Sequence, residues 1–584
     1  MLRWDNLFDA DALPRYAFIS IASCLVYIAW CLYALRNKNA IVYHPLIYLL
    51  IVYLCWAGLS FLWSVDPSAT TQSLLSMSAF FILIFLAIQI SYTPENIKIL
   101  IIVSVSAGTL ISLLGLMQLL GFEPFSIQQT KPPASTFGNK NHAAQYLDLI
   151  VPLSLILVFT EINRSRYWLL SLALGCNIAY LLNTYSRGSW LAFAVVLMVL
   201  VYILIKNQPA RAFVIQRFPK RKIPLLIAII IPVIFSVLAV NNAKDQIEEK
   251  LSVNSSVDVR LKSYANAVAA IADNSATGIG HGAFMLGYRK YMFTNAPLIE
   301  TNETLYLVNL HNDFLQEFVE LGIGGGILFL IIYLWLLLLC WRNTVNHSDS
   351  TNIYAIGILL ALIAFGTHAL VSFPLHRPTS AMEFWLLAGL AMGISDRRPT
   401  LSKTLGHTVK IISLIAVSLL LTYSVYYYVH YFKNSAQVLM LKERLAAQNC
   451  SSALNIASNL DYKQSYDTKI YVPLVYNICY AIDREKSFQK MNEVLAYDPY
   501  SSLARITRGA LLLEMNQPAE AADDFLNVVT VLPHRPTAYV GLGHAAVNMG
   551  KTQLATEMYQ KALSLDANNQ AALDMLEKLG DINK

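Results

Sequence analysis

Five polar segments interrupt a chain that is otherwise rich in apolar residues, and their side chains are the ones that could carry chemistry. They place arginine, lysine, histidine, asparagine and glutamine beside long apolar stretches. Such side chains are costly at a membrane helix unless they bind something or bind one another. We therefore expect a site that binds anionic oxygens and moves protons. The segments are 135–153, 184–190, 256–291, 311–330 and 372–378.

The first segment, STFGNKNHAAQYLDLIVPL, contains a polar turn that leads into an apolar helix. Asn139 or Asn141 can cap this helix, and Gln145 lies one turn beyond Asn141 on the same face. For the two asparagines alone, helix capping and substrate binding are equally good interpretations. It does not explain why Lys140, His142 and Gln145 accompany them, so we expect this group to have a function.

Two arginines lie in short breaks between apolar stretches. Arg187, in TYSRGSW, is on a face otherwise poor in positive charge and therefore needs an anionic partner. Its planar guanidinium group suits phosphate oxygens, and a structural salt bridge is the alternative. Arg377 follows His376 in SFPLHRP, where Pro374 and Pro378 interrupt the apolar run. Prolines in a membrane helix leave backbone groups without helical partners, and such groups can line a cavity. Here we favour the alternative, a simple turn between two helices.

The stretch SVDVRLKSYANAVAAIADN, 256–274, predicts an amphipathic helix with Arg260 and Lys262 near its start. One face of this helix carries Leu261, Tyr264, Ala265 and Val268. Three glycines follow in TGIGHGAFMLGYRKY, and backbone N–H groups of such a turn can cradle phosphate. This pattern is weak, because it lacks the strand and helix of a nucleotide-binding motif.

His311 opens a predicted helix, HNDFLQEFVELGIGGGILFL, that enters the membrane after Glu320. Asn312, Gln316 and Glu320 share one side of this helix. A lone histidine at an interface is more often a hydrogen-bonded structural residue. Beside arginines on the same face, a general base becomes a reasonable hypothesis, because the pKa of histidine lies near neutral pH.

The composition shows which elements must position these residues. Of 584 residues, 56% are hydrophobic and 14% are charged, and the mean hydropathy is +0.48. About a quarter of a soluble protein is charged, so the chain predicts an all-α fold, a polytopic bundle of membrane helices. Cytosolic, collagen-like, disordered and disulfide-rich secreted classes are excluded. The net charge of +6 reflects short cationic loops, and no nucleic-acid partner is expected.

About twelve apolar stretches are long enough to cross a membrane. Lys and Arg gather in the short segments 161–166, 206–222 and 396–410, which places these segments in the cytoplasm. With twelve spans, both termini and the long segment 242–317 then lie on the outer face. The stretches are 16–35, 43–63, 73–91, 97–120, 144–161, 166–185, 188–205, 223–241, 318–341, 353–373, 379–395 and 409–431.

After residue 433 the composition becomes that of a soluble helical domain, which divides the chain into 1–433 and 434–584. Two consecutive units, 502–535 and 536–569, resemble tetratricopeptide repeats. The small and large residues expected of the repeat are Gly509, Ala521, Phe525 and Pro533 in the first unit and Tyr539, Leu542, Gly543, Ala555, Tyr559 and Ala562 in the second. The first unit departs from the pattern at Arg508, where leucine is usual.

Two repeats cannot bury a core alone, so helices from residues 434–500 must stack on them. The domain either presents a groove to a protein partner or forms a stabilising cap, and the sequence leaves both interpretations open. Cys450 and Cys479 would lie in an oxidising compartment on this topology. Whether they form a disulfide is also left open.

Taken together, TFGNKNHAAQYL, SRGSWLAF, the RLKSY helix, GIGHGAF and HNDFLQEFVELG resemble the O-antigen ligase superfamily. This superfamily includes O-antigen ligases, polysaccharide polymerases and bacterial protein O-oligosaccharyltransferases. The resemblance covers about residues 50–395 and implies a GT-C-like helical architecture. It also implies a multi-pass protein of the bacterial inner membrane whose active site and C-terminal domain face the periplasm. The implied activity needs no metal and no cofactor, and its donor is a glycan on undecaprenyl diphosphate.

The resemblance assigns roles to individual residues. Arg187 and Arg260 match the family's essential outer-face arginines, and His311 matches its loop histidine, so these three are predicted to be catalytic. Guanidinium groups would stabilise the leaving lipid diphosphate, and His311 would deprotonate the acceptor hydroxyl in an inverting displacement. The predicted substrate-binding residues are Lys140, Asn141, His142, Gln145 and Arg377.

The acceptor and the oligomeric state are left open. A lipid A core, another lipid-linked glycan or a Ser/Thr side chain would make the protein a ligase, a polymerase or a protein O-glycosyltransferase. A lipid-glycan flippase is the alternative from another class, but it predicts charged residues through the bilayer midplane rather than at one face. A membrane-anchored scaffold whose repeats bind a protein partner is the third hypothesis.

Overall fold

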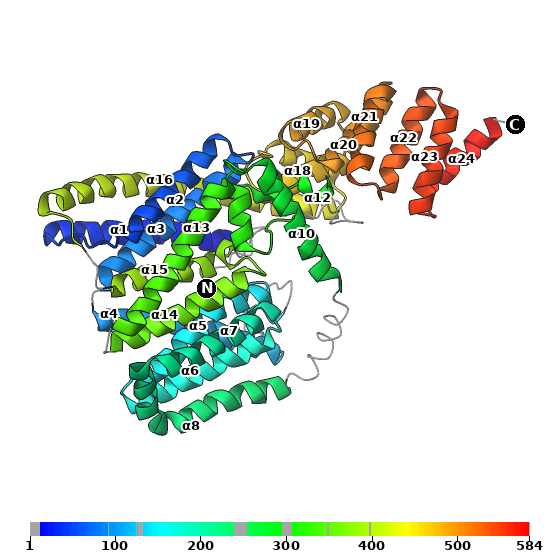
Figure 1. Cartoon of the computed structure of the whole chain (residues 1–584). Helices are drawn as coiled ribbons and strands as arrows, with labels where there is room; N and C mark the ends of the chain where they lie inside the picture. Colours follow the sequence, from blue (N-terminus) through cyan, green and yellow to red (C-terminus); the bar gives the residue numbers. More distant parts are fainter. Residues whose placement is uncertain are drawn as a thin grey trace.

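The computed structural model describes residues 12–91, 93–123, 125, 132–238, 254–294, 307–346, 350–395 and 399–582, and the regular elements in these ranges are all helices (Figure 1). The predicted all-α class is confirmed. Each of the twelve apolar stretches coincides with a helix, although the end of the stretch 223–241 lies outside the described residues. The helices are α1 (Ala12–Arg36), α2 (Leu46–Leu59), α3 (Pro67–Ile90), α4 (Pro94–Leu119), α5 (Lys140–Thr160), α6 (Arg164–Asn183), α7 (Arg187–Lys206), α8 (Gln208–Leu238), α13 (Asp313–Asn346), α14 (Ser350–Ala369), α15 (Pro378–Ile394) and α16 (Lys403–Ala446).

Eight of the described helices are long and apolar enough to cross a membrane, namely α1, α3, α4, α5, α7, α8, α13 and α16. The shorter apolar helices α2 and α14 and the helices α6 and α15 pack among them. The protein is therefore a multi-pass membrane protein, while the count of twelve spans stays a prediction. The segment 206–222, expected to be a loop, is instead largely helical, because α8 begins at Gln208.

The helix α5 lies inside the bundle, where it packs against α4, α6 and α14. It is the most buried of the eight helices, with 94% of its apolar window inside the protein. Asn139 caps its start by accepting a hydrogen bond from the Asn141 N–H at 2.9 Å. The first polar segment is thus fixed on a helix that has little freedom to move.

The loops between helices gather at two opposite ends of the bundle. At one end the Pro399 carbonyl accepts a hydrogen bond from the Tyr43 N–H at 3.0 Å, which joins two loops rich in positive charge. At the other end the Val65 N–H donates to the Ile279 carbonyl at 3.1 Å, and the His281 N–H donates to the Ser60 hydroxyl at 3.0 Å. This second end carries the long outer segment and the C-terminal domain (Figure 1).

The outer segment contains α10 (Asn254–Asp273), α11 (Phe284–Gly287) and α12 (Tyr291–Thr294). Residues 242–253 and 295–306 of the predicted segment 242–317 lie outside the described residues. The predicted apolar face of α10 is not the face that packs on the rest of the protein, because Leu261 and Val268 are 62% and 61% exposed. The small residues Ala267 and Ala270 are buried instead, and they let α10 approach α13 closely.

The C-terminal part is a row of helix pairs (Figure 1). The predicted unit 502–535 contains α20 and α21, and the unit 536–569 contains α22 and α23. The preceding helices α18 and α19 contact α20, as predicted for a stack that needs further helices. The helices are α17 (Cys450–Ser458), α18 (Tyr466–Ile478), α19 (Arg484–Tyr497), α20 (Ser502–Glu514), α21 (Pro518–Val531), α22 (Pro536–Asn548), α23 (Thr552–Leu565) and α24 (Gln570–Ile582).

The unusual Arg508 of the first repeat has a structural explanation. Its Nε and Nη2 atoms each donate to a different oxygen of the buried Asp524 at 2.7 Å. A bidentate pair of this kind replaces the apolar contact that leucine would make. The repeat therefore keeps its helix packing despite the departure from the consensus.

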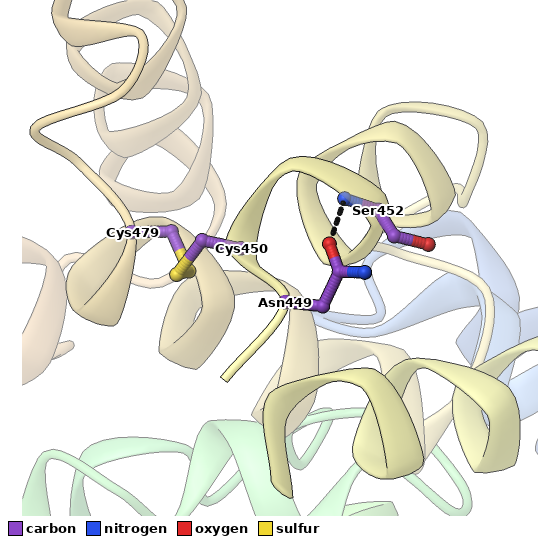
Figure 2. Close-up of a disulfide and its surroundings, with 4 residues drawn as sticks. All are labelled: Asn449, Cys450, Ser452 and Cys479. Carbon is purple, nitrogen blue, oxygen red and sulfur yellow. Dashed lines mark hydrogen bonds between the residues drawn. A yellow bond between two sulfur atoms is a disulfide. The ribbon is translucent and has the colours of Figure 1, made fainter. Parts of the chain in front are cut away.

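Cys450 and Cys479, left open by the sequence, form a disulfide that ties the start of α17 to the end of α18 (Figure 2). Figure 2 also shows Asn449 capping α17 through the Ser452 N–H, at 3.0 Å. The helix before them, α16, runs without a break from the bundle to Ala446, past the predicted boundary at residue 433. The membrane part and the C-terminal part are thus joined by continuous helix rather than by a linker.

The C-terminal domain docks on the bundle through two buried ion pairs. Lys469 of α18 pairs with Asp66, which also accepts a hydrogen bond from the Tyr497 hydroxyl at 2.8 Å. Arg289 of the outer segment pairs with Asp498. All four charged side chains are at most 5% exposed, so separating the parts would expose buried charges that lose their partners.

Candidate functional site

The short segment 368–377 joins α14 to α15 and includes the 3-10 turn Pro374–His376. It lies at the same end of the bundle as the outer segment, because the Tyr264 hydroxyl donates to the Leu370 carbonyl at 3.3 Å. The predicted site residues come from five distant parts of the sequence. The structure brings most of them to this segment or to residues that touch it.

Three predicted residues surround the ring of Phe373. The His311 ring centroid is 4.8 Å from the Phe373 centroid, and the His142 centroid is 5.9 Å from it. The Arg377 guanidinium carbon lies 4.9 Å from the same centroid. One aromatic side chain therefore gathers two histidines and one arginine that no sequence spacing relates.

The backbone holds His311 in an uncommon conformation. Its φ is +61°, in the left-handed region that residues other than glycine seldom adopt. The Tyr264 hydroxyl donates to the His311 carbonyl at 2.8 Å and fixes this turn directly before α13. Strained backbone of this kind persists where the surrounding structure holds it, and it is frequent at functional sites.

The start of α5 contributes further predicted residues. Gln145 is buried, and its Nε2 atom donates to the Ser372 hydroxyl at 2.7 Å. Lys140 is also buried, and its Nζ atom lies 5.9 Å from the ring centroid of Tyr185. Gln145 thus points to the segment 368–377, whereas Lys140 points to the turn that carries Arg187. Of the two asparagines that could cap α5, Asn139 is the cap, and the role predicted for the Asn141 side chain stays a prediction.

Arg187 is the first residue of α7, and its side chain is exposed. The next residue, Gly188, packs so tightly that a Cβ atom there would lie 2.6 Å from the His368 ring and 3.2 Å from Val371. Only glycine fits this contact, and it fixes the start of α7 against the segment 368–377. The packing of Gly188 therefore fixes the position of the Arg187 backbone.

Arg260 reaches the site through α10. It is half-buried and lies one turn before Tyr264, which bonds to both His311 and Leu370. Burial raises the pKa of the Tyr264 hydroxyl, and the positive charge of Arg260 opposes this rise. Arg260 is thus one helical turn from the tyrosine that holds the turn carrying His311.

A buried cluster next to Arg187 was missed by the sequence analysis. The Asp148 Oδ2 atom lies 2.5 Å from the His368 Nδ1 atom and accepts a hydrogen bond from the Ser189 hydroxyl at 3.0 Å. These residues come from α5, α14 and α7. A lone carboxylate inside an apolar helix was the available clue, because such a group needs a partner.

A second missed pair lies at the other end of the segment. The His376 Nδ1 atom is 2.7 Å from the Asp313 Oδ1 atom, and the Leu375 N–H donates to Asp313 at 2.7 Å. Burial alone would lower the pKa of His376. The hydrogen bond that His376 donates to Asp313 and the charges of Asp313, Glu320 and Glu317 outweigh burial and raise this pKa to about 9.

Fold and site together define a class, a multi-pass all-α membrane protein with a polar site at one end of its helices and a helical repeat domain at that end. Residues 169–330 match the family model described as O-Antigen ligase, and residues 536–569 match the model described as Tetratricopeptide repeat. This match over part of the chain agrees with the superfamily that the motifs predicted. The O-antigen ligase domain includes Arg187, Arg260 and His311, whereas the α5 residues and Arg377 lie outside the matched range.

Proposed function

We propose that this protein, whose family is that of ligase- or polymerase-type membrane glycosyltransferases, transfers a glycan from undecaprenyl diphosphate to an acceptor hydroxyl. The observation that carries the proposal is the convergence of the predicted residues on the segment 368–377 within and beside the O-antigen ligase domain. Basic side chains and a histidine held by strained backbone suit a reaction that releases a diphosphate and moves one proton.

The chemistry balances in one displacement step. The acceptor oxygen attacks the anomeric carbon of the donor sugar, and the bond from that carbon to the diphosphate oxygen breaks. The electron pair goes to the diphosphate, whose new charge Arg187 and Arg260 stabilise without a metal. The acceptor proton passes to His311. Attack from the face opposite the leaving group inverts the anomeric centre.

The remaining predicted residues would bind the substrates. Lys140, His142 and Arg377 are the remaining basic groups of the site and would hold the donor diphosphate. Gln145, fixed by Ser372, and Asn141 would orient the glycan or the acceptor. These assignments extend the proposal and are tested with it.

The arrangement of the loops supports a periplasmic site. The cationic loops meet at one end of the bundle, and the site and the C-terminal domain lie at the other end (Figure 1). Because positively charged short loops stay in the cytoplasm, the site faces outward in the bacterial inner membrane. An undecaprenyl-linked glycan is reached there from the outer leaflet.

Purified protein, undecaprenyl-diphosphate glycan and three separate acceptors test the proposal. The acceptors are lipid A core, a Ser/Thr-rich protein and further donor, all supplied with EDTA. We expect a product whose formation is lost in His311→Ala and Arg187→Ala. His407→Ala and Arg211→Ala, at the other end of the bundle, serve as matched controls. Normal transfer by both site variants would reject the site, and donor movement across liposomes without product would favour a flippase.

A further inference from the structure

A pocket of about 290 Å³ lies where the bundle meets the C-terminal domain. Met77 of α3, Glu317 of α13 and Trp385 of α15 contribute from the bundle, and Tyr466 and Lys469 of α18 contribute from the C-terminal domain. Its volume is near the lower end of small-molecule sites, which are roughly 300–1,000 Å³. A pocket of this size suits a small ring system better than a whole lipid or a folded protein.

The walls of this pocket combine flat aromatic rings with neutral hydrogen-bonding groups. Tyr53, Trp385 and Tyr466 supply rings, while Gln72 and Asn309 supply amides that both donate and accept. A ligand with a flat apolar face and several hydroxyl groups satisfies both kinds of wall. A saccharide ring has this combination.

Most charges in the walls are already paired with one another. Asp66 pairs with Lys469, the Glu320 Oε2 atom lies 3.3 Å from the His281 Nδ1 atom, and His376 pairs with Asp313. Paired charges offer little net attraction to an ion. A diphosphate is better suited by Arg187, Arg260 and Lys140, which lie outside the pocket lining.

The remaining carboxylate fits a hydroxyl-bearing ligand. Glu317 is buried, and its Oε2 atom accepts a hydrogen bond from the Tyr53 hydroxyl at 2.7 Å. A carboxyl group has several lone pairs that accept hydrogen bonds. The lone pairs that Tyr53 does not use can accept a hydrogen bond from a hydroxyl group of the ligand.

The pocket adjoins the proposed catalytic residues. Arg377 belongs to its lining and also lies over the Phe373 ring that His311 contacts. Val308 and Asn309, which line the pocket, precede His311 by three and two residues. A sugar bound in the pocket can therefore present a hydroxyl toward His311.

We propose that this pocket binds the terminal saccharide of a glycan acceptor, so that the bundle and the C-terminal domain build the acceptor site together. The inference rests on the proposed function and narrows it to transfer onto a sugar. It also gives the C-terminal domain a direct part in the reaction, because Tyr466 and Lys469 come from that domain.

Two changes test the pocket by different means. Met77→Trp fills it from the bundle, and Tyr466→Ala removes a ring from the C-terminal side. Ser78→Trp on α3 and Tyr471→Ala on α18 are matched controls, since neither residue lines the pocket. The probe is the oligosaccharide released from the lipid donor by mild acid, added to the full-length protein in detergent.

We expect the probe to raise the melting temperature of the wild type and of both controls. In Met77→Trp and Tyr466→Ala the half-saturating probe concentration should rise at least tenfold, in binding and as acceptor KM. Unchanged half-saturation in both pocket variants would overturn the inference. Binding of a Ser/Thr peptide in place of the sugar, lost in the same variants, would also overturn it.

The test separates this inference from the proposed function. If the wild type cleaves no donor but binds the oligosaccharide in a Met77-dependent way, the pocket stands and the transferase proposal fails. If the wild type transfers glycan and the pocket variants raise only the donor KM, the transferase stands and the acceptor pocket is wrong.

Discussion

Two carboxylate–histidine pairs flank the segment 368–377, one at each end, and their surroundings differ. Asp148 and His368 are 2.5 Å apart, and both side chains are at most 4% exposed. The hydroxyl of Ser189 closes this pair, with its Oγ atom 3.0 Å from Asp148 and 3.2 Å from His368. Every partner comes from a helix of the bundle, so the cluster ties α5, α7 and α14 together.

The second pair, Asp313 and His376, has the same chemistry but faces a pocket. Its atoms are 2.7 Å apart, and the His376 side chain is 21% exposed. The difference teaches that one chemical motif serves two purposes in this protein. The Asp148–His368 pair (the closed pair) holds the start of α7, where Arg187 lies, whereas the Asp313–His376 pair (the open pair) places a histidine in the pocket wall.

The largest expected effect comes from breaking the closed pair. Asp148→Ala leaves His368 and Ser189 buried without their shared acceptor, which should lower the free energy of unfolding by about 3–5 kcal/mol. Thermal unfolding in detergent measures the loss, and the donor KM should rise because Gly188 packs on His368. The exposed Asp258→Ala is the control. Equal melting temperatures of the two variants would show that the cluster does not stabilise the packing of α5, α7 and α14.

The open pair should instead set a pH dependence. The pKa of His376 is raised to about 9 from 6.5. The stabilisation by Asp313 is therefore complete below pH 6.5 and lost as the pH rises through about 9. The loss is on the order of 3 kcal/mol.

Asp313→Asn should reduce this fall strongly, because the neutral amide no longer favours the charged imidazole and only the weaker effects of Glu320 and Glu317 are left. Melting temperatures of the wild type and the variant between pH 6 and pH 10 measure the difference. The exposed His430→Ala serves as the control that keeps the fall. A wild-type profile that is flat between pH 6.5 and pH 9 would contradict the raised pKa of His376.

The smallest effect is expected for Ser189→Ala, which removes one hydroxyl and leaves the Asp148–His368 pair intact. One hydrogen bond of this kind contributes about 1 kcal/mol, so the melting temperature should fall only slightly below that of Ser78→Ala. A loss as large as that of Asp148→Ala would show that the three side chains act as one cooperative unit.

The repeat domain was readable from the sequence because its contacts are local. Gly543 faces Tyr559 within one repeat, and a Cβ atom on Gly543 would lie 2.4 Å from that ring. The small and large positions therefore report the packing directly. The apolar spans were predicted for the same reason, since each depends only on its own composition.

For the site, the sequence predicted which residues take part but not how they come together. Motif identity selected His142, His311 and Arg377, but their meeting at Phe373 depends on helix packing that no spacing encodes. The apolar pattern of α10 did not reveal which face packs on α13, because this close approach uses the small residues Ala267 and Ala270 rather than large apolar ones. His368 was missed because single polar residues are common in apolar helices, and nothing in the sequence around it points to Asp148 as its partner.

The ion pair between Asp66 and Lys469 has a consequence for how the protein is made. The two residues are 403 positions apart in the chain. At synthesis rates of about 5–20 residues per second, Asp66 waits roughly 20–80 s for its lysine to be translated. The aspartate must stay hydrated during that time, so the C-terminal domain cannot yet cover the start of α3, which Asp66 caps. Closure of this end of the bundle is therefore among the last events of biogenesis, after the ribosome has nearly finished the chain.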